Sequence, residues 1–233
     1  SSPPTTTQTR AERMPELQGV GIGRGLALGP VLRMPDPLPE PADVQSAIGV
    51  NAEKERATAA LAATAALIRL RGERAGGTAK DVLEAQAFMA EDPTLSEDVA
   101  ARIQTGKTAE RAAFEAFASF RDLLLGMGGY MSERATALDD VSQRVVAQLA
   151  GVPVPGVPDP DYPFVLFARD LAPADTALLN LDKIIALVTS DGGPTSHTAI
   201  LAREKSIVAV VGAIGAMDVV DGMAVIVDAT SGL

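Results

Sequence analysis

The hydrophobic pattern of this 233-residue chain changes its period once, at a proline-rich segment that separates two differently organised stretches. Between about residues 43 and 150, apolar residues recur at the spacing of helices, as in Val141, Val145 and Leu149. After residues 152–163 (VPVPGVPDPDYP), short continuous apolar runs alternate with helical stretches. Because the two patterns demand different packing, we expect a helix bundle beside an α/β domain.

Glycine and proline residues divide the first stretch into separate helices. The pattern predicts a long alanine-rich helix that ends near Gly76, a second helix from about 79 to 90, and an interruption at Pro93. Three more helices follow, the last with Ser132 as its N-cap and Gly151 as its C-cap. We interpret their apolar stripes as the core of a bundle.

The second stretch predicts short buried strands. The expected strands are 164–167, 183–189, 206–211 and 224–228. A short helix is expected at 172–179, and a turn at Asp221 and Gly222. This alternation favours an α/β domain with some parallel pairing. The turn at 230–232 has no returning strand after it, which predicts that the chain is a fragment of a longer protein.

The N-terminal residues carry weaker signals. We expect residues 1–16, which are polar and rich in Pro and Thr, to be a mobile tail. Residues 18–33 (QGVGIGRGLALGPVLR) predict a loop and short strands. They do not predict a dinucleotide site, because the pattern G-x-G-x-x-G fails in every register.

Composition excludes several classes of function. The chain has no cysteine and one histidine, which rules out disulfides, zinc fingers, iron–sulfur sites and metal sites that need two imidazoles. Its net charge of −10 disfavours nucleic-acid binding and favours basic partners. No apolar run approaches the length of a membrane span, and no signal peptide is present. These features fit a cytoplasmic protein.

The run TSDGGPTSHTAILAR carries the chemistry of the chain. It joins a buried strand to a helix through Gly192 and Gly193, which allow a tight turn and a close approach of a ligand. If Thr195 or Ser196 caps the helix, His197 lies in its first turn. The helix dipole then favours a neutral imidazole with a nitrogen free to attack, and the unpaired N–H groups suit a phosphate. His197 is therefore a candidate nucleophile that becomes a phosphate carrier.

Other interpretations of this histidine stay open at this point. A single histidine is more often structural than nucleophilic. The hydroxyls of Thr195, Ser196 and Thr198 could donate to a phosphate, and Ser196 or Thr198 could accept one in place of the imidazole. A serine hydrolase is poorly supported, because G-x-S-x-G is absent and Ser196 adjoins His197 in sequence.

The run from Gly192 to Arg203 resembles the GGxTSHxAIxAR motif of phosphohistidine "swivelling" domains. Enzyme I of the bacterial sugar phosphotransferase system, phosphoenolpyruvate synthase and pyruvate phosphate dikinase share this motif. Three other segments resemble Enzyme I, namely the glycine-rich run Gly19–Gly29, YMSERA at 130–135 followed by Asp140, and DLAP at 170–173 followed by Thr176. Together the matches cover most of residues 18–230.

The resemblance implies a fold class, an α/β phosphohistidine swivelling domain with an inserted all-α helical-bundle subdomain. Its expected parts are residues 17–35 plus 152–233 for the α/β domain and residues 36–150 for a helical subdomain that binds the carrier protein HPr. The match is to the N-terminal half of Enzyme I and stops before the barrel that binds phosphoenolpyruvate.

The resemblance also implies a reaction, in which a phosphoryl group passes from phosphoenolpyruvate to His197 and then to HPr. The C-terminal domain, absent here, would bind phosphoenolpyruvate with Mg²⁺, and no cofactor or metal is expected in this chain. The full-length protein is expected to be a cytoplasmic homodimer without membrane insertion. In the family the phosphate sits on the ring nitrogen remote from the backbone, and a threonine matching Thr176 orients the ring through the other nitrogen. Arg203 is a candidate for phosphate binding or structural pairing.

By the same resemblance the helical insert docks HPr. Residues 79–98 carry six acidic residues and one lysine, a local charge of −5. The acids could steer a basic partner, although a charged stripe is usually only a solvated face. The expected docking residues are Asp81, Glu84, Gln86, Phe88, Met89 and Glu91. Enzyme I commonly has a histidine in an E-x-H pattern here, whereas this chain has Gln86, which offers hydrogen bonds but no imidazole.

Two alternatives remain. The chain could be the swivelling domain of a phosphoenolpyruvate synthase or a dikinase, against which the long helical insert argues. It could also be a non-catalytic adaptor that binds a basic protein through its acidic helices. Phosphotransfer from phosphorylated HPr distinguishes the first alternative, and the effect of replacing His197 distinguishes the second.

Overall fold

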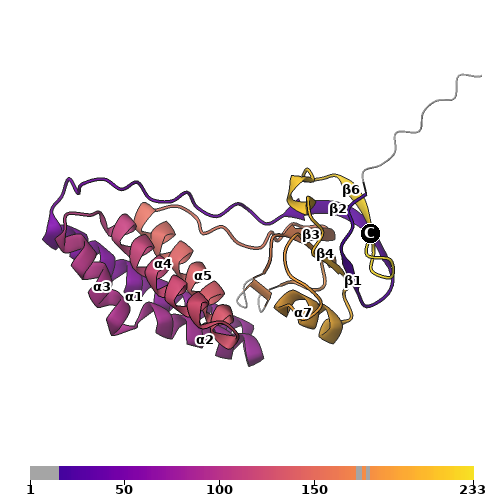
Figure 1. Ribbon diagram of the computed structural model, residues 1–233, viewed down its shortest axis with the longest axis horizontal. Helices are drawn as coiled ribbons and strands as arrows, with labels where there is room; N and C mark the ends of the chain where they lie inside the picture. The colour runs from indigo at the N-terminus through magenta and orange to yellow at the C-terminus, as the bar shows by residue number, and fades with distance from the viewer. Residues whose placement is uncertain (1–15, 172–174, 177–178) are drawn as a thin grey trace, which may run out of the picture.

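The computed structural model describes residues 16–171, 175–176 and 179–233. The expected tail at 1–16 and the expected helix at 172–179 therefore fall largely outside the described residues. Within these residues, five long helices lie between the second and third strands in sequence (Figure 1). Their bounds are α1 Val50–Ala75, α2 Gly77–Ala90, α3 Pro93–Gln104, α4 Ala109–Met127 and α5 Tyr130–Ala150.

Local signals set the helix ends. Gly76 ends α1 with a φ of 65°, a left-handed value that glycine adopts without strain, and the chain reverses into α2. Asp92 and Thr108 cap α3 and α4 by accepting hydrogen bonds from backbone N–H groups. Gly151 ends α5 in the left-handed conformation, as expected. The prediction for Ser132 is wrong, because α5 already begins two residues earlier, after a glycine.

Small side chains dominate the core of the helical bundle. Ala60 and Ala65 on α1, Ala87 on α2, and Ala112 and Ala116 on α4 are each at most 3% exposed. Small residues at these positions let neighbouring helices approach closely. In the described part of the chain, no helix is both long and apolar enough to cross a membrane.

One carboxylate is buried at the edge of this core. Glu53 on α1 is 1% exposed, and its Oε2 accepts a hydrogen bond of 2.7 Å from the backbone N–H of Ala109, the first residue of α4. Its Oε1 accepts a second from Arg56, which also pairs with Glu110 and donates to the carbonyl of Leu149. The network ties α1 to the start of α4 and the end of α5. Its polar groups are paired, as burial requires.

Six strands form one curled sheet in the order β1-β5-β4-β3-β2-β6. The strands are β1 Val20–Ile22, β2 Leu26–Arg33, β3 Phe164–Ala168, β4 Ile184–Thr189, β5 Val208–Val211 and β6 Ala224–Asp228. The four strands β2, β3, β4 and β5 pair in parallel, and β1 and β6 pair antiparallel with β5 and β2. The expected partly parallel α/β arrangement is confirmed.

The two sides of the sheet pack differently. Helix α7 (His197–Lys205) covers one side, where Ala199 and Ala202 contact a core that includes Phe164 and Leu187. The pair β2–β6 lies on the opposite side of β3 and β4 (Figure 1). Its inward residues join Val165 and its neighbours in a second core, which also receives a 3-10 turn at 216–218.

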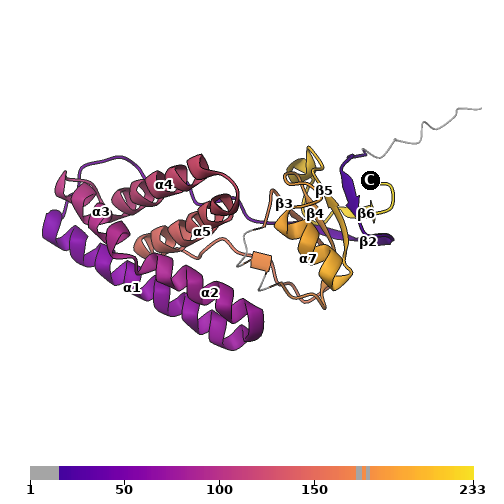
Figure 2. The ribbon, with the colours of Figure 1, turned by 60° about the horizontal axis from the view of Figure 1, so that its bottom comes forward.

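The helical bundle interrupts a continuous sheet. Val31 on β2 lies directly opposite Val165 on β3, although all five helices separate these residues in sequence. Two segments, 34–49 and 151–163, connect the bundle to the sheet, and the two parts lie side by side (Figure 2). The bundle is therefore an insert in the α/β domain. The boundaries 17–35, 36–150 and 152–233 themselves stay a prediction.

A cluster of charges links α3 and α4. Glu115 on α4 accepts hydrogen bonds from Lys107 (2.9 Å) and Arg111 (2.6 Å) through one oxygen, and from Arg102 (3.1 Å) through the other. Partial burial of the Glu115 carboxyl raises its pKa, but the bonds from Lys107 and Arg111 outweigh this and lower the pKa to about 2.

We predict that Glu115 stabilises the fold in a pH-dependent way. Its folded pKa lies below its ordinary value of 4.5, so its contribution is present above pH 4.5 and is lost as the pH falls towards 2. Glu115→Gln should lower the free energy of unfolding by roughly 2 kcal/mol at pH 7. Urea unfolding from pH 7 to 3 measures this difference, which should shrink below pH 4.5.

The matched control is Glu97→Gln, because Glu97 is exposed on α3 and has no ion-pair partner among the described residues. This variant should unfold like the unmodified chain at every pH. A Glu115→Gln difference that is constant from pH 7 to 3 would contradict the assignment.

Candidate functional site

The single histidine lies at the first position of α7. Ser196 is the N-cap, and its hydroxyl accepts a hydrogen bond of 3.3 Å from the N–H of Ala199. His197 is exposed, and the backbone N–H groups of His197 and Thr198 have no backbone acceptor in the described part of the chain. An accessible imidazole thus lies beside unpaired donors at the positive end of a helix dipole.

The two glycines before the helix shape its entry. Gly192 has a φ of 84°, and a Cβ there would lie 3.2 Å from the Cβ of Ser196. Its left-handed backbone and the short distance both require glycine. The carbonyl of Gly193 accepts a hydrogen bond from the N–H of Ser196 and so closes the turn that leads into α7. No neighbour within 4 Å would obstruct a Cβ at Gly193.

Thr176 contacts the imidazole through a different nitrogen from the one expected. Its Oγ1 lies 3.1 Å from Nε2 of His197, the nitrogen remote from the backbone. The resemblance assigns Thr176 to the other nitrogen and the phosphate to this one. The ring projects from α7 towards the segment after β3, so its tip meets the buried threonine. In this conformation the atom expected to carry phosphate is hydrogen-bonded.

The three hydroxyls expected near a phosphate differ in their surroundings. Thr195 is exposed, and no described residue bonds its hydroxyl. Thr198 is fully buried and lies 3.2 Å from Oδ1 of Asp170, to which its hydroxyl donates. The Thr198 hydroxyl is therefore neither a phosphate donor nor an accessible acceptor, and that prediction is wrong. It ties the first turn of α7 to the end of β3, a role that the sequence did not reveal for Asp170.

Arg203 has a structural partner. Its guanidinium donates to the carbonyl of Pro194, nine residues before it, and so fastens the glycine turn to α7. The group is exposed and keeps further donors. Of the two roles expected for Arg203, the structure shows the structural one.

The segment that carries Thr176 lies near the helical insert. Burial and the neighbouring Arg144 lower the pKa of Arg71 on α1, whereas Asp140 and Asp175 oppose this effect. Asp175 precedes Thr176 directly in sequence. Asp175, the neighbour of Thr176 in sequence, thus lies within electrostatic reach of Arg71 on α1.

Gln86 is not available for docking. It is 2% exposed, and both polar atoms of its side chain lack a hydrogen-bond partner among the described residues. The expectation that Gln86 contacts HPr is wrong, because α2 turns this position towards α1 and α5. Met89 is half-buried against the bundle core, whereas Phe88 is 61% exposed.

The acidic residues of α2 are partly neutralised by an arginine that the sequence pattern missed. Arg69 on α1 bonds Glu84 at 3.0 Å and also pairs with Glu91, and its guanidinium lies 5.2 Å from the ring centre of Phe88. Asp81 is exposed near the start of α2. Residues 69 and 84 are nearly the same number of residues away from the turn at Gly76 in the sequence. This symmetry is the signal that could have placed Arg69 beside Glu84. We call Arg69, Asp81, Glu84, Phe88 and Glu91 the α2 face.

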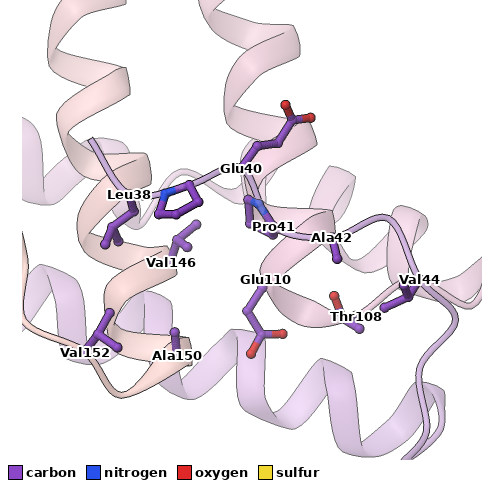
Figure 3. A pocket seen from close by; sticks show the side chains of 11 residues that line it. Leu38, Glu40, Pro41, Ala42, Val44, Thr108, Glu110, Val146, Ala150 and Val152 are labelled. Atoms are coloured by element: carbon purple, nitrogen blue, oxygen red, sulfur yellow. The ribbon is translucent and has the colours of Figure 1, made fainter. Parts of the chain in front are cut away.

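A groove in the helical insert does not include His197 among its lining residues. It measures about 440 Å³ and lies between residues 38–44 and the adjoining ends of α4 and α5 (Figure 3). Leu38, Val146 and Val152 give it an apolar lining. The described residues contain no group of three or more acidic or histidine side chains that could hold a metal ion.

Two protein-family models together match most of the described chain. Residues 18–134 match the model "PEP-utilising enzyme, N-terminal", and residues 160–232 match "PEP-utilising enzyme, mobile domain". The first covers the start of the sheet and most of the bundle. The second covers the rest of the sheet with His197.

Curated relatives agree with these models. A phosphoenolpyruvate-protein phosphotransferase of Streptomyces coelicolor is 52% identical over 217 residues, which are 93% of this chain and 39% of that protein. The phosphoenolpyruvate-protein phosphotransferase of Bacillus subtilis is 34% identical over 228 residues, 94% of this chain and 40% of that protein. The chain thus spans about two fifths of these relatives.

Solved structures show the same arrangement. A solution NMR structure of an Enzyme I protein (nEIt) matches with a TM-score of 0.75 and 32% identity, over 94% of this chain and 91% of that one. An N-terminal domain of the nitrogen Enzyme 1, at 24% identity and a TM-score of 0.59, shares the fold. The chain therefore belongs to the phosphoenolpyruvate-utilising enzyme family and, within it, resembles the N-terminal part of Enzyme I in both sequence and fold.

Proposed function

We propose that this chain is the phosphoryl-transfer part of a phosphoenolpyruvate-protein phosphotransferase that passes a phosphoryl group from phosphoenolpyruvate through His197 to HPr. The observation that carries the proposal is the exposed imidazole at the first position of α7, beside unpaired N–H groups. The names of the curated relatives support the reaction class. The proposal also places the protein in the cytoplasm and makes the full-length form a homodimer.

The first chemical step forms a P–N bond. A hydroxyl can donate to a bare ring nitrogen, so Thr176 would hold the tautomer with its proton on Nδ1 and the lone pair on Nε2. Nε2 attacks the phosphorus of phosphoenolpyruvate, the P–O bond to the enol oxygen breaks, and the pyruvate enolate leaves and takes a proton. For this step the ring must release Thr176, whose hydroxyl can then donate to a phosphoryl oxygen.

The second step reverses the bonding at His197. An imidazole of HPr attacks the phosphorus, the P–N bond to Nε2 breaks, and the lone pair returns to the ring. The first-turn N–H groups of α7 stabilise the anion throughout because they are fixed before it arrives. Exposure of His197 allows both partners to reach it in turn.

Phosphoenolpyruvate would be bound outside this chain. The C-terminal part of the full-length protein would supply that site and its Mg²⁺. The described residues contain no group of three or more potential metal ligands, and the proposal assigns none of them to a Mg²⁺ ion.

HPr would dock on the α2 face. Exposed Phe88 offers an apolar anchor, and Asp81, Glu84 and Glu91 surround it with acidic groups. Arg69 fixes Glu84 and Glu91 by ion pairs and stacks on Phe88, so the face is ordered before a partner arrives. A basic partner surface would complement the remaining charge.

The first prediction of the proposed function concerns the atom that accepts the phosphoryl group. Incubation with phosphorylated HPr should add one phosphoryl group to the peptide that contains His197, detected by mass spectrometry under alkaline conditions. The group should be lost in acid, because a P–N bond is labile there. His197→Ala should abolish labelling without loss of stability, since the side chain is exposed.

The matched control is Ser196→Ala, which removes a helix cap but keeps the imidazole. It should cost about 1 kcal/mol of stability and retain the label. Acid-stable phosphate on Ser196, or labelling that survives His197→Ala, would reject the histidine as acceptor. A chain that HPr never labels would favour the synthase or dikinase alternative, or an adaptor.

The second prediction concerns the threonine at the ring. Thr176→Val keeps the shape of the side chain and removes the hydroxyl beside Nε2. Phosphotransfer from phosphorylated HPr should slow about tenfold, the effect of losing one hydrogen bond to the transferred group. Thr176→Ser should restore most of the rate. Labelling reactions quenched at a series of times measure the transfer rates of both variants. Equal rates for the valine and serine variants would show that the hydroxyl has no role.

The third prediction separates buried from exposed positions of one helix. Gln86→Leu removes an unpaired buried amide, so it should raise the free energy of unfolding by about 1–3 kcal/mol and leave the affinity for HPr unchanged. Phe88→Ala removes an exposed ring and should weaken HPr binding about tenfold with little change in stability. Calorimetric titration and urea unfolding test both variants. Weaker HPr binding by Gln86→Leu alone would return Gln86 to the docking surface.

A further inference from the structure

The outer side of the β2–β6 pair is apolar and uncovered. Leu28 lies directly opposite Ile226 in the antiparallel pair, and Leu26 lies opposite Asp228. Leu26, Leu28 and Ile226 are 69%, 66% and 64% exposed. We call these three residues the outer patch. Side chains directly or diagonally across a strand pair are within contact distance, so the patch is continuous.

The inner side of the same pair is already packed. Ala27 and Val227 are at most 8% exposed and belong to the core on that side of the sheet. A Cβ at Gly29 would lie 2.5 Å from Ile185 of β4, so the pair presses closely on the sheet. A strand pair with one face in solvent normally alternates apolar and polar residues. Here the outer face carries three large aliphatic side chains with Asp228 at one end, so most of it follows the pattern of strands that are covered on two sides.

The described residues leave the outer patch largely exposed. Helix α7 lies on the opposite side of β3 and β4, and the bundle lies beyond the other end of the sheet (Figures 1 and 2). Large aliphatic side chains gathered on one face mark a contact with another polypeptide. The occupant must therefore come from outside the described residues.

The last residue described here lies next to this patch. The N–H of Asp228 donates to the carbonyl of Leu233 at 2.6 Å, and the N–H of Leu233 donates back to Asp228 at 3.2 Å. Asp228 is the residue directly opposite Leu26. Any polypeptide that continues from Leu233 starts beside Asp228, the neighbour of Leu26 across the strand pair. The curated relatives are more than twice as long as the segment they share with this chain.

We propose that, in the full-length protein, the polypeptide that follows Leu233 packs an apolar face on Leu26, Leu28 and Ile226. The proposal rests on the proposed function in one respect, that the chain is the N-terminal part of a longer phosphotransferase. The contact fastens the connection to the C-terminal part at the edge of the sheet, on the side away from α7. It thereby leaves His197 and the α2 face free for their partners.

Thiol labelling tests the contact without relying on phosphotransfer. The chain has no cysteine, so Leu28→Cys places a single thiol at the centre of the patch. The same substitution is made in residues 1–233 and in the full-length protein, and a maleimide labels both. Mass spectrometry then follows the peptide that contains position 28. Labelling should be at least about tenfold slower in the full-length protein, because a covered thiol reacts only during local opening.

Two further variants control the measurement. Ile226→Cys should be protected in the same way, since it lies across the pair from position 28. Leu123→Cys on α4, which is 56% exposed and far from the patch in the fold, should react equally in both proteins. The labelling of the Leu123→Cys thiol also shows that the maleimide is active in each preparation.

The outcomes are distinct. Equal labelling of positions 28 and 226 in both proteins would overturn the proposal. Protection that appears already in residues 1–233 and grows with protein concentration would also overturn it, in favour of a second copy as the occupant. Phosphotransfer from phosphorylated HPr, measured on the same preparations, reports separately on the proposed function.

Discussion

The chemistry of this chain depends on where one helix begins. Ser196 caps α7, so His197 occupies the first helical position with its ring outside and its backbone N–H unpaired. The cap in turn depends on Gly192, whose left-handed backbone no larger residue would adopt without strain. A shift of this start by one residue would turn the imidazole away from Thr176. The turn therefore fixes the proposed nucleophile, its hydrogen-bond partner and the unpaired N–H donors together.

The insert gives this site a second surface. Because β2 and β3 are parallel neighbours, the bundle leaves the sheet at the end of β2 and returns at the start of β3. Arg71 on α1 lies within electrostatic reach of Asp175, the residue before Thr176. The α2 face, fixed by Arg69, belongs to this bundle. A carrier that docks there can be brought to the histidine by movement of one part relative to the other, a hinge change that two connecting segments allow.

Much of this arrangement could be predicted from the sequence. Periodicity located the five helices and four of the strands, since glycines and prolines mark their ends clearly. The sequence placed His197 in the first turn of a helix and left Thr195 or Ser196 as its cap, and the structure shows that Ser196 is the cap. Local spacing could not show that Thr198 is buried against Asp170, because that contact joins the first turn of α7 to the segment after β3, which only the folded sheet brings together. It also could not show that Gln86 faces the core, or that Arg69 neutralises acids on another helix, because both follow from how α1 packs on α2. The ring nitrogen that meets Thr176 depends on a side-chain rotation, which a motif does not specify.

The central claim is that Nε2 of His197 leaves Thr176 and takes the phosphoryl group. Nitrogen-15 NMR of the imidazole, recorded before and after phosphorylation by phosphorylated HPr, tests it most directly. The account predicts that the Nε2 signal reports a hydrogen bond before transfer and coupling to phosphorus afterwards, with the proton on Nδ1 throughout. Phosphorus coupled to Nδ1, with Nε2 still bound to the threonine, would contradict it.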